Sequence, residues 1–187
     1  MAPRTRDGKR RGSPPVPPAG ARLWAPWRYT YLRKASAASQ RCIFCVGKLT
    51  EAARRRRLIL LDTPAALVML NLYPYNSGHL MVAPRRHVAS PELLSREERI
   101  EIGELVAAAI GAMRKAVRPA GFNVGANLGR SAGAGFAEHM HWHIVPRWDG
   151  DTNFMPATAG TRVISQSLGD SYRQLRPVFK ALARDLS

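Results

Sequence analysis

The chain has 187 residues, 45% of them hydrophobic, and carries 29 lysines and arginines against 13 aspartates and glutamates, a formal charge of +16. Its length and apolar content suit one globular domain and exclude a chain that is disordered throughout. The sequence has no run of about 18 apolar residues and no apolar secretory signal. We therefore expect a cytoplasmic protein with anionic partners, phosphorylated small molecules or nucleic acid. The alternative is a solvated basic surface with no single partner.

The first 20 residues are rich in arginine, lysine, proline and glycine, and they predict a disordered basic tail. The composition then changes, so we expect one domain over residues 21–187. The aromatic segment 22–34 should pack on that domain or on a partner subunit. The informative motifs lie within 40–150, and 151–187 form an extension.

Hydrophobic patterning predicts an antiparallel sheet combined with helices, an α+β domain. Five segments have strand character: 58–61, 67–70, 79–82, 121–128 and 139–146. Turn residues at 73–78 predict a hairpin between the second and third strands, with Pro84 ending the third. Ser95 and Glu98 form a capping box before a helix that Pro119 stops. Apolar residues from Tyr172 onward predict a C-terminal helix, interrupted or kinked at Pro177.

Three of the five histidines, His139, His141 and His143, alternate within five residues. On an extended strand they would share one face, while the intervening apolar residues would join the core. The three side chains could bind one zinc ion, could be buried core histidines, or could comprise a nucleophile with neighbours that orient it. Neutral imidazole is abundant near pH 7 and attacks phosphorus well, so the pattern favours the nucleophile.

Two further features have a chemical meaning. Cys42 and Cys45 form a C-x-x-C motif and are the only cysteines in the sequence. A disulfide framework is not expected, so the motif is either a redox pair or half of a metal site. The loop 129–135 is rich in glycine, serine and alanine and precedes the histidines. Successive N–H groups in such a loop can bind phosphate.

Residues 127–147, NLGRSAGAGFAEHMHWHIVPR, resemble the signature of the histidine-triad family. Residues 71–87, NLYPYNSGHLMVAPRRH, resemble the first hairpin of the same family, and the similarity spans roughly 40–150. The resemblance implies an α+β HIT-like fold with a five-stranded antiparallel sheet, one long helix and a C-terminal helix. It also implies nucleotide binding and a homodimer.

The resemblance implies a role for each matching residue. His141 matches the nucleophile that accepts a nucleoside monophosphate. His143 matches the histidine that contacts phosphate oxygens and assists the leaving group, and His79 matches a supporting histidine on the adjacent strand. Asn71 matches a contact to ribose or base. Other nucleotide contacts are expected at Asn127, Ser131, Gly133 and Gly135.

In zinc-bearing members of the family, the C-x-x-C motif combines with a histidine after the hairpin and with the first histidine of the triad. The matching residues are Cys42, Cys45, His87 and His139. Four such ligands leave no open position, so the resemblance implies a structural zinc ion. No organic cofactor is expected.

Most hydrolase branches of the family carry glutamine and then serine or threonine where this chain has Gly135 and Phe136. The segments LWAPWR, CIFC, GFNVGANLG and AEHMHWHIVPRW are instead similar to the bacterial diadenosine tetraphosphate phosphorylase branch. This similarity implies that AMP is transferred to His141 with release of ATP. Inorganic phosphate then removes the AMP as ADP.

Three alternatives remain open from the sequence. The chain could hydrolyse dinucleoside polyphosphates or nucleoside phosphoramidates on the same fold. It could be a non-catalytic basic module that binds nucleotides or RNA, or a zinc-stabilised scaffold. The positive charge suits a polyphosphate substrate, and it permits nucleic acid without requiring it.

Overall fold

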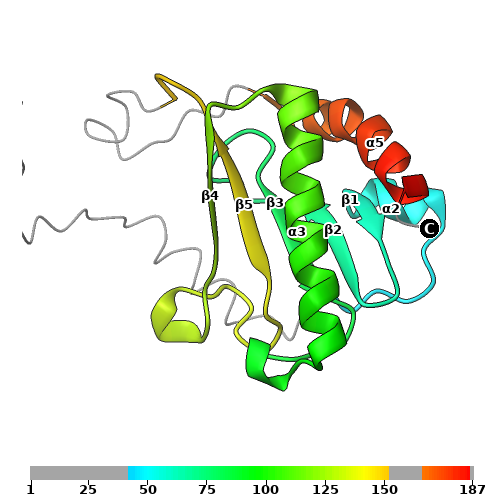
Figure 1. The fold of residues 1–187 in the computed structure, drawn as a ribbon, viewed down its shortest axis with the longest axis vertical. Coiled ribbons are helices and arrows are strands. Elements are labelled where there is room, and N and C mark those ends of the chain that lie inside the picture. Colours follow the sequence, from blue (N-terminus) through cyan, green and yellow to red (C-terminus); the bar gives the residue numbers. More distant parts are fainter. Residues whose placement is uncertain (1–41, 152–165, 186–187) are drawn as a thin grey trace, which may run out of the picture.

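The computed structural model describes residues 42–151 and 166–185, which form a five-stranded sheet with helices (Figure 1). The predicted tail 1–20 and the aromatic segment 22–34 lie outside the described residues. The elements in chain order are α2 (Glu51–Arg56), β1 (Ile59–Asp62), β2 (Ala66–Leu70), β3 (Leu80–Pro84), η1 (Pro91–Leu93), α3 (Arg96–Val117), β4 (Gly121–Ala126), η2 (Arg130–Ala132), β5 (Trp142–Arg147) and α5 (Leu168–Asp185). None of these helices is long and apolar enough to cross a membrane.

The strands follow the order β1-β2-β3-β5-β4, and all neighbours are antiparallel. The predicted α+β fold with a five-stranded antiparallel sheet is therefore confirmed. β2 and β3 form the predicted hairpin, in register from Ala66 opposite Pro84 to Leu70 opposite Leu80. β5 lies between β3 and β4, which puts the last histidine of the predicted triad in the interior of the sheet.

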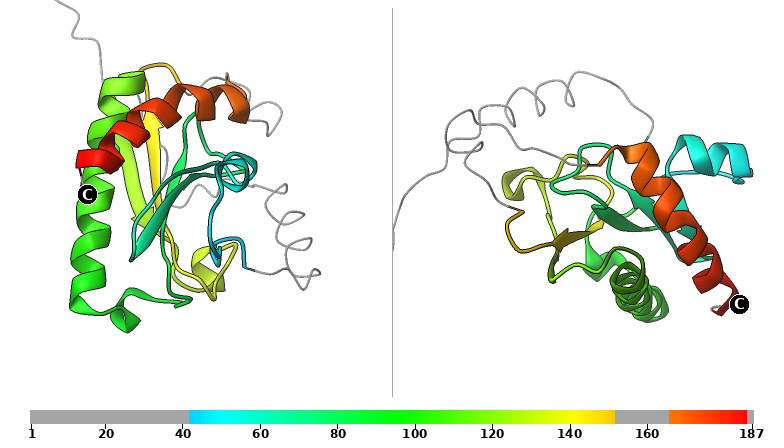
Figure 2. Two further views of the ribbon diagram at one scale, coloured as in Figure 1. Left: turned by 90° about the vertical axis from the view of Figure 1, so that its right-hand side faces the viewer. Right: turned by 90° about the horizontal axis from the view of Figure 1, so that it is seen from above.

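Both faces of the sheet are covered, by different parts of the chain. Figure 2 shows α3 and α5 on one side and the segment leading into α2 on the other. The larger apolar cluster lies under the helices and includes Leu70, Met113 and Phe179. The smaller cluster forms where Phe44 packs on side chains of β1, β2 and β3, among them Met81. Alternate residues of one strand therefore enter two different cores.

The helices follow their local signals. Ser95 and Glu98 form both bonds of the predicted capping box at the start of α3, and α3 ends at Val117 before Pro119. α5 packs against α3 and β1, and it runs through Pro177 without the predicted interruption. Pro177 is exposed, so water can satisfy the carbonyl group that its missing N–H leaves without a partner. The short helix α2 was not predicted.

Two predicted strands are shorter in the structure. β5 begins at Trp142 rather than at residue 139, and β4 ends at Ala126 rather than at residue 128. The early residues of the predicted β5 have other partners: the N–H of Met140 donates to the carbonyl of Val88 at 2.7 Å. The facing end of β3 is Pro84, which has no N–H to donate to a ladder.

Candidate active site

His141 and His143 lie at the start of β5, on the sheet face opposite α3. Their ring centroids are 4.8 Å apart at an interplanar angle of 73°. Met140 and Ile144 are buried in the core under the helices, as the alternation predicted. His141 and His143 therefore lie on the same face of the sheet, as predicted, although only His143 belongs to β5 itself.

A single hydrogen bond fixes the tautomer of His141. Its Nδ1 lies 3.0 Å from the backbone carbonyl oxygen of His139. Since a carbonyl only accepts, Nδ1 must carry the proton and donate it. In the neutral ring Nε2 is then unprotonated, and it is the nitrogen that can attack an electrophile.

His143 and His79 form a second hydrogen-bonded unit, anchored by the backbone of the hairpin. The N–H of Tyr75 donates to Nδ1 of His79 at 3.0 Å. A neutral His79 therefore carries its proton on Nε2, which donates to Nδ1 of His143 at 2.9 Å. It follows that a neutral His143 keeps its own proton on Nε2. The tautomers of both rings thus depend on one backbone amide.

Burial keeps the imidazoles of His79 and His141 neutral. Burial, together with the nearby His143 and His141, lowers the pKa of His79 to about 3. Burial also lowers the pKa of His141, and the bond to the His139 carbonyl opposes this effect only in part. Near pH 7 both rings are therefore in the neutral form that the hydrogen bonds require.

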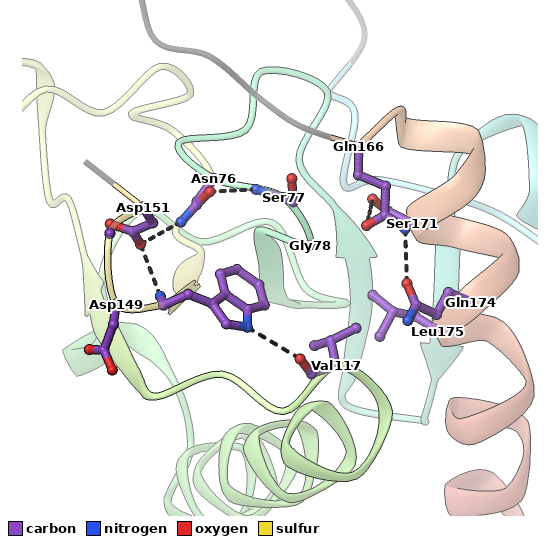
Figure 3. A pocket seen from close by; sticks show the side chains of 12 residues that line it. Asn76, Ser77, Gly78, Val117, Asp149, Asp151, Gln166, Ser171, Gln174 and Leu175 are labelled. Carbon is purple, nitrogen blue, oxygen red and sulfur yellow. Dashed lines mark hydrogen bonds between the residues drawn. The ribbon is translucent and has the colours of Figure 1, made fainter. Parts of the chain in front are cut away.

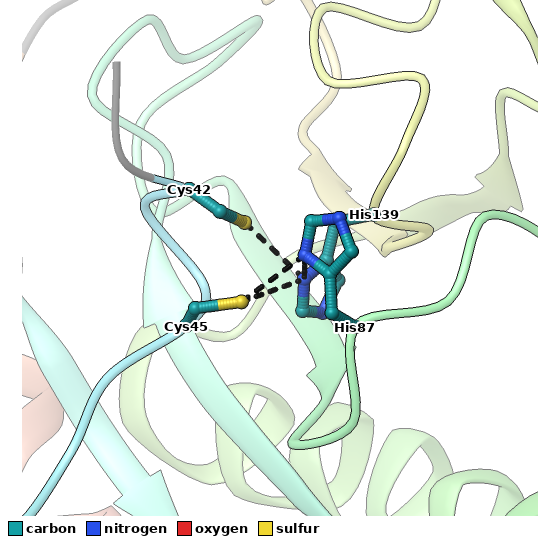
Figure 4. Close-up of side chains that lie close together, drawn as sticks. All are labelled: Cys42, Cys45, His87 and His139. Carbon is teal, nitrogen blue, oxygen red and sulfur yellow. Dashed lines mark hydrogen bonds between the residues drawn. The ribbon is translucent and has the colours of Figure 1, made fainter.

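A second cluster brings together the four residues that the sequence assigned to a metal. Nδ1 of His139 lies 3.2 Å from Sγ of Cys42 and 3.6 Å from Sγ of Cys45. Nδ1 of His87 lies 3.1 Å from Sγ of Cys45 and 3.2 Å from Nδ1 of His139. Figure 4 shows the four side chains pointing toward one another. Their ligand atoms all lie within 4.8 Å of one another, so the set could hold a metal ion.

The donor chemistry fits zinc. Ligand atoms at the corners of a zinc tetrahedron are separated by about 3.3–3.8 Å, given metal–ligand distances of about 2.0–2.3 Å. Of the four separations above, 3.6 Å lies within this range, and the other three, at 3.1–3.2 Å, lie slightly below it. Nε2 of His139 donates to the carbonyl of Pro84 at 2.9 Å, which leaves Nδ1 unprotonated and directed into the cluster.

The predicted nucleotide contacts are distributed over the hairpin and the glycine-rich loop. The side chain of Asn71 accepts the N–H of Tyr73 at 2.9 Å, and its amide nitrogen lies 3.5 Å from Nδ1 of His79. Asn127 follows directly on β4, and Ser131 lies exposed in η2. The nucleotide contacts of these residues stay a prediction.

The glycine-rich loop is partly bonded to itself. The N–H of Gly133 donates to the carbonyl of Arg130, and the N–H of Ala134 donates to the carbonyl of Gly129. These two amides are therefore not available to a phosphate in this conformation. Gly133 has φ +88°, which only glycine adopts at little cost, so it allows the loop to turn. Nucleotide binding by Gly133 and Gly135 stays a prediction.

A cavity of about 620 Å³ lies away from the histidines, between the hairpin and the ends of α3 and α5 (Figure 3). Among the residues that the structure describes, its lining contains Asp149 and Asp151 but no lysine or arginine. Asp151 is bound by Arg147 at 2.6 Å and by Asn76 at 2.8 Å. A cavity whose only charged lining groups are carboxylates does not suit a polyphosphate, so the candidate site remains at the histidines.

Comparisons with known proteins identify the family. A model of the HIT domain matches residues 53–150. An AP-4-A phosphorylase of Mycobacterium tuberculosis is 42% identical over 161 residues, which are 82% of each chain. The chain belongs to the HIT family. An adenosine 5'-monophosphoramidase of Schizosaccharomyces pombe is 36% identical over 88 residues, 47% of this chain and 62% of the relative.

Solved structures of HIT proteins share the fold. A hypothetical histidine triad nucleotide-binding protein from Sulfolobus tokodaii superposes with a TM-score of 0.57 at 23% identity, covering 78% of this chain and 93% of the other. A zinc-bound histidine triad family protein from Mycobacterium smegmatis gives a TM-score of 0.55 at 19% identity, covering 83% and 96%. The resemblance found in the sequence is thus confirmed, and the chain is a HIT-family enzyme.

The burial of His79 in this HIT domain predicts a loss of stability in acid. The unfolded chain binds a proton on this residue at its ordinary pKa of 6.5, whereas the folded chain does so only near 3. The contribution of neutral His79 to the free energy of unfolding is complete above pH 6.5. It falls as the pH decreases toward 3, by at most about 1.4 kcal/mol per pH unit. His79→Asn should therefore flatten the pH dependence of the free energy of unfolding, measured by urea denaturation with a chelator present.

The exposed His87 provides the matched control for this measurement. His87→Asn, in the same chelator, makes the same substitution at an exposed ring, so its curve shows what the substitution does where no burial is lost. A His79→Asn curve parallel to that of the unmodified chain between pH 4 and 6.5 would contradict the assignment of His79 as a buried neutral ring.

Two aromatic residues of the site were missed in the sequence. Phe44 stacks on His141 with ring centroids 4.7 Å apart, and Tyr75 lies 4.8 Å from His79 and 5.8 Å from His143. The only signal for Phe44 was its position between the two cysteines. Tyr75 lies in a hairpin turn, where a tyrosine carries no pattern that indicates a contact with the triad.

Proposed function

We propose that this HIT enzyme cleaves diadenosine tetraphosphate by phosphorolysis through an AMP–His141 intermediate. The observation that carries the chemistry is the bond from Nδ1 of His141 to the His139 carbonyl, which leaves Nε2 as the nucleophile. Nε2 attacks the α-phosphorus, the bond to the bridging oxygen breaks, and ATP leaves. An oxygen of inorganic phosphate then attacks the same phosphorus, breaks the bond to His141 and releases ADP.

The proton positions of the second histidine pair support this course. His143, with its proton on Nε2, can donate to an oxygen of the polyphosphate as charge builds up on the leaving group. His79, which directly precedes β3, holds His143 in this tautomer through the bond from its Nε2. Because His79 stays neutral near pH 7, its Nδ1 can accept from Tyr75 while its Nε2 donates to His143. His143 contacts the substrate in this scheme, while His79 acts through His143.

The choice of phosphate over water as acceptor is supported by two observations. The relative from Mycobacterium tuberculosis, 42% identical, is a phosphorylase. Gly135 and Phe136 stand where the hydrolase branches carry glutamine and serine or threonine. A dinucleoside polyphosphate with several negative charges also suits a chain of charge +16.

Product analysis tests the acceptor. Diadenosine tetraphosphate is supplied with increasing inorganic phosphate, and the nucleotides are separated and quantified. We expect ATP and ADP in equal amounts, at a rate that rises with phosphate and then saturates. AMP in place of ADP, at a rate that phosphate does not change, would make the enzyme a hydrolase. Salt-dependent binding of RNA without turnover of any dinucleotide would instead favour the binding module.

We also propose that the four-residue cluster binds structural zinc. The supporting observations are the convergence of Cys42, Cys45, His87 and His139 and the zinc-bound relative from Mycobacterium smegmatis, which shares the fold. When bound, zinc would supply a closed structural centre and leave the phosphoryl chemistry to the imidazoles. The cluster would fasten the segment before α2 to the start of β5.

The edge of the sheet supports the expected homodimer, which we propose forms through β4. Within the described residues, β5 is the only strand that pairs with β4. Val124 on β4 is 45% exposed, and it lines an apolar groove of about 240 Å³ together with α3 residues such as Ile102. An unpaired strand edge next to an apolar groove favours pairing with a second copy about a two-fold axis.

Charge at this edge should dissociate the dimer. Val124→Lys places an ammonium group at the centre of the proposed contact, so sedimentation velocity should show a shift from dimer to monomer. Leu72→Lys is the matched control, because Leu72 is 49% exposed on the hairpin and the variant should stay dimeric. A Val124→Lys protein that remains dimeric would rule out β4 as the interface.

A further inference from the structure

Phe44 occupies an unusual place in the chain, since it lies between the two cysteines of the metal cluster and against the proposed nucleophile. Its side chain is 1% exposed. Its ring is stacked on that of His141, with centroids 4.7 Å apart and planes at 30°. The same ring lies 5.1 Å from that of His139. Phe44 thus contacts both a candidate metal ligand and the residue expected to carry the nucleotide.

The contacts of His141 divide into those that fix one atom and those that fix the plane of the ring. The bond from Nδ1 to the His139 carbonyl fixes one edge of the ring but leaves rotation about that bond. The stacked Phe44 removes this rotation by packing on one face, while His143 meets the ring edge-on at 4.8 Å. The direction of Nε2 is therefore set jointly by the carbonyl and by Phe44.

Two of these three contacts come from the metal cluster itself. His139 supplies the carbonyl, and Phe44 is flanked by Cys42 and Cys45. Cys45 is exposed, so the short segment that carries Phe44 lies partly at the surface. Once both thiols were bound to a metal together with His139, the segment would be cross-linked to the residues just before β5, and Phe44 would be held against His141. Attack in line requires the nucleophile to be held within about 0.5 Å and 10–20° of its productive position.

We propose that Phe44 is a positioning residue for His141, and that a metal ion bound by Cys42, Cys45, His87 and His139 keeps it stacked there. The inference rests on the proposed function insofar as His141 is the nucleophile. It gives the metal a role beyond stability, because the same ion that joins the segment to β5 also determines where Nε2 points. A purely structural alternative exists, since Phe44 also packs on Met81 in the smaller core.

The orientation of the ring can be observed without turnover. Nitrogen-15 spectra of the histidine rings, recorded at pH 8 with and without zinc, report the tautomer, and His141→Gln identifies the signal by its loss. We expect one sharp signal from the zinc-loaded chain, with the proton on Nδ1. Removal of zinc, or Phe44→Leu in the presence of zinc, should let the ring turn until its bond to the His139 carbonyl breaks, so the signal should broaden and show both tautomers. An unchanged His141 signal in both samples would overturn the proposal.

Kinetics separate positioning from stability. In single-turnover adenylation of His141, zinc-loaded Phe44→Leu should react about 10- to 100-fold more slowly, the size expected for a misplaced nucleophile. KM should change little and zinc content should stay at one ion per chain. Phe179→Leu is the matched control, because Phe179 is equally buried but belongs to α5 and packs in the other core. A similar slowing in both variants would show a merely structural role.

The ring signals also distinguish this proposal from the proposed function. If the unmodified chain turns over no dinucleotide but its His141 signal still depends on zinc and on Phe44, the proposed function fails and the positioning contact stands. If turnover is normal and neither zinc nor Phe44 affects the His141 signal or the adenylation rate, the proposed function stands and the positioning role is wrong.

Discussion

Replacing His141 with alanine should reduce the turnover of diadenosine tetraphosphate by at least about 10⁴-fold, because no other group can form the covalent intermediate. The bond from its Nδ1 to the His139 carbonyl leaves Nε2 as the attacking atom in the neutral ring. The loss should appear in both kcat and kcat/KM. In His143→Ala the nucleophile is retained, so a smaller loss of about 10²- to 10⁴-fold is expected for a missing proton donor.

The intermediate itself provides the direct test. The unmodified enzyme, denatured during turnover and digested, should yield a peptide that contains His141 and carries AMP, and His141→Ala should yield none. Circular dichroism and zinc content must match between the two proteins, so that a folding defect is not mistaken for a chemical one. Turnover by His141→Ala within tenfold of the unmodified rate would exclude the covalent mechanism.

Loading zinc should raise the melting temperature by about 8–16 °C. Ligand at a thousand times its dissociation constant stabilises a fold by about 4 kcal/mol, and for a chain of this length each kcal/mol corresponds to about 2–4 °C. Zinc should stabilise the fold because it joins three segments that are distant in the sequence, around Cys42, His87 and His139. Differential scanning calorimetry of chelated and zinc-loaded protein measures the shift.

The double variant Cys42→Ser/Cys45→Ser is the control for this shift. It removes both thiolate ligands while preserving the size of the side chains, so zinc should not change its melting temperature. Cobalt bound in place of zinc should show the absorption of a tetrahedral thiolate site in the unmodified protein alone. A zinc-dependent shift of equal size in the double variant would place the metal elsewhere.

The acid dependence of stability provides a third effect, which is independent of turnover. It derives from the pKa of His79, which burial and its neighbours lower to about 3. Since the folded state takes up this proton at a lower pH than the unfolded state, the contribution of His79 to the free energy of unfolding falls as the pH decreases from 6.5. The same lowered pKa keeps His79 neutral and thereby maintains the tautomer of His143.

Local patterns in the sequence predicted most of the fold. The capping box at Ser95 and Glu98, the apolar repeat that follows and the hairpin turn before His79 each depend on neighbours within a few residues. These signals predicted α3, β2 and β3 with small errors at their ends. The errors occurred where a distant partner competes, as where Val88 takes the N–H of Met140 from the sheet.

In the candidate site, too, the sequence predicted some features and not others. The alternation of His139, His141 and His143 predicted a shared face, and the family resemblance assigned His139 to the metal set. The sequence could not predict that a backbone amide at Tyr75 would fix the tautomer of two histidines. It also gave no sign that Phe44 would stack on His141, since these residues are 97 positions apart.

The sequence by itself thus determined the residue types, their spacing and the elements that present them, because these follow from short-range periodicity and from motifs. Only the tertiary structure decided the proton positions, the packing of Phe44 and the distances within the predicted set of Cys42, Cys45, His87 and His139. These features depend on distances of a few ångströms between segments that meet only when both faces of the sheet are covered.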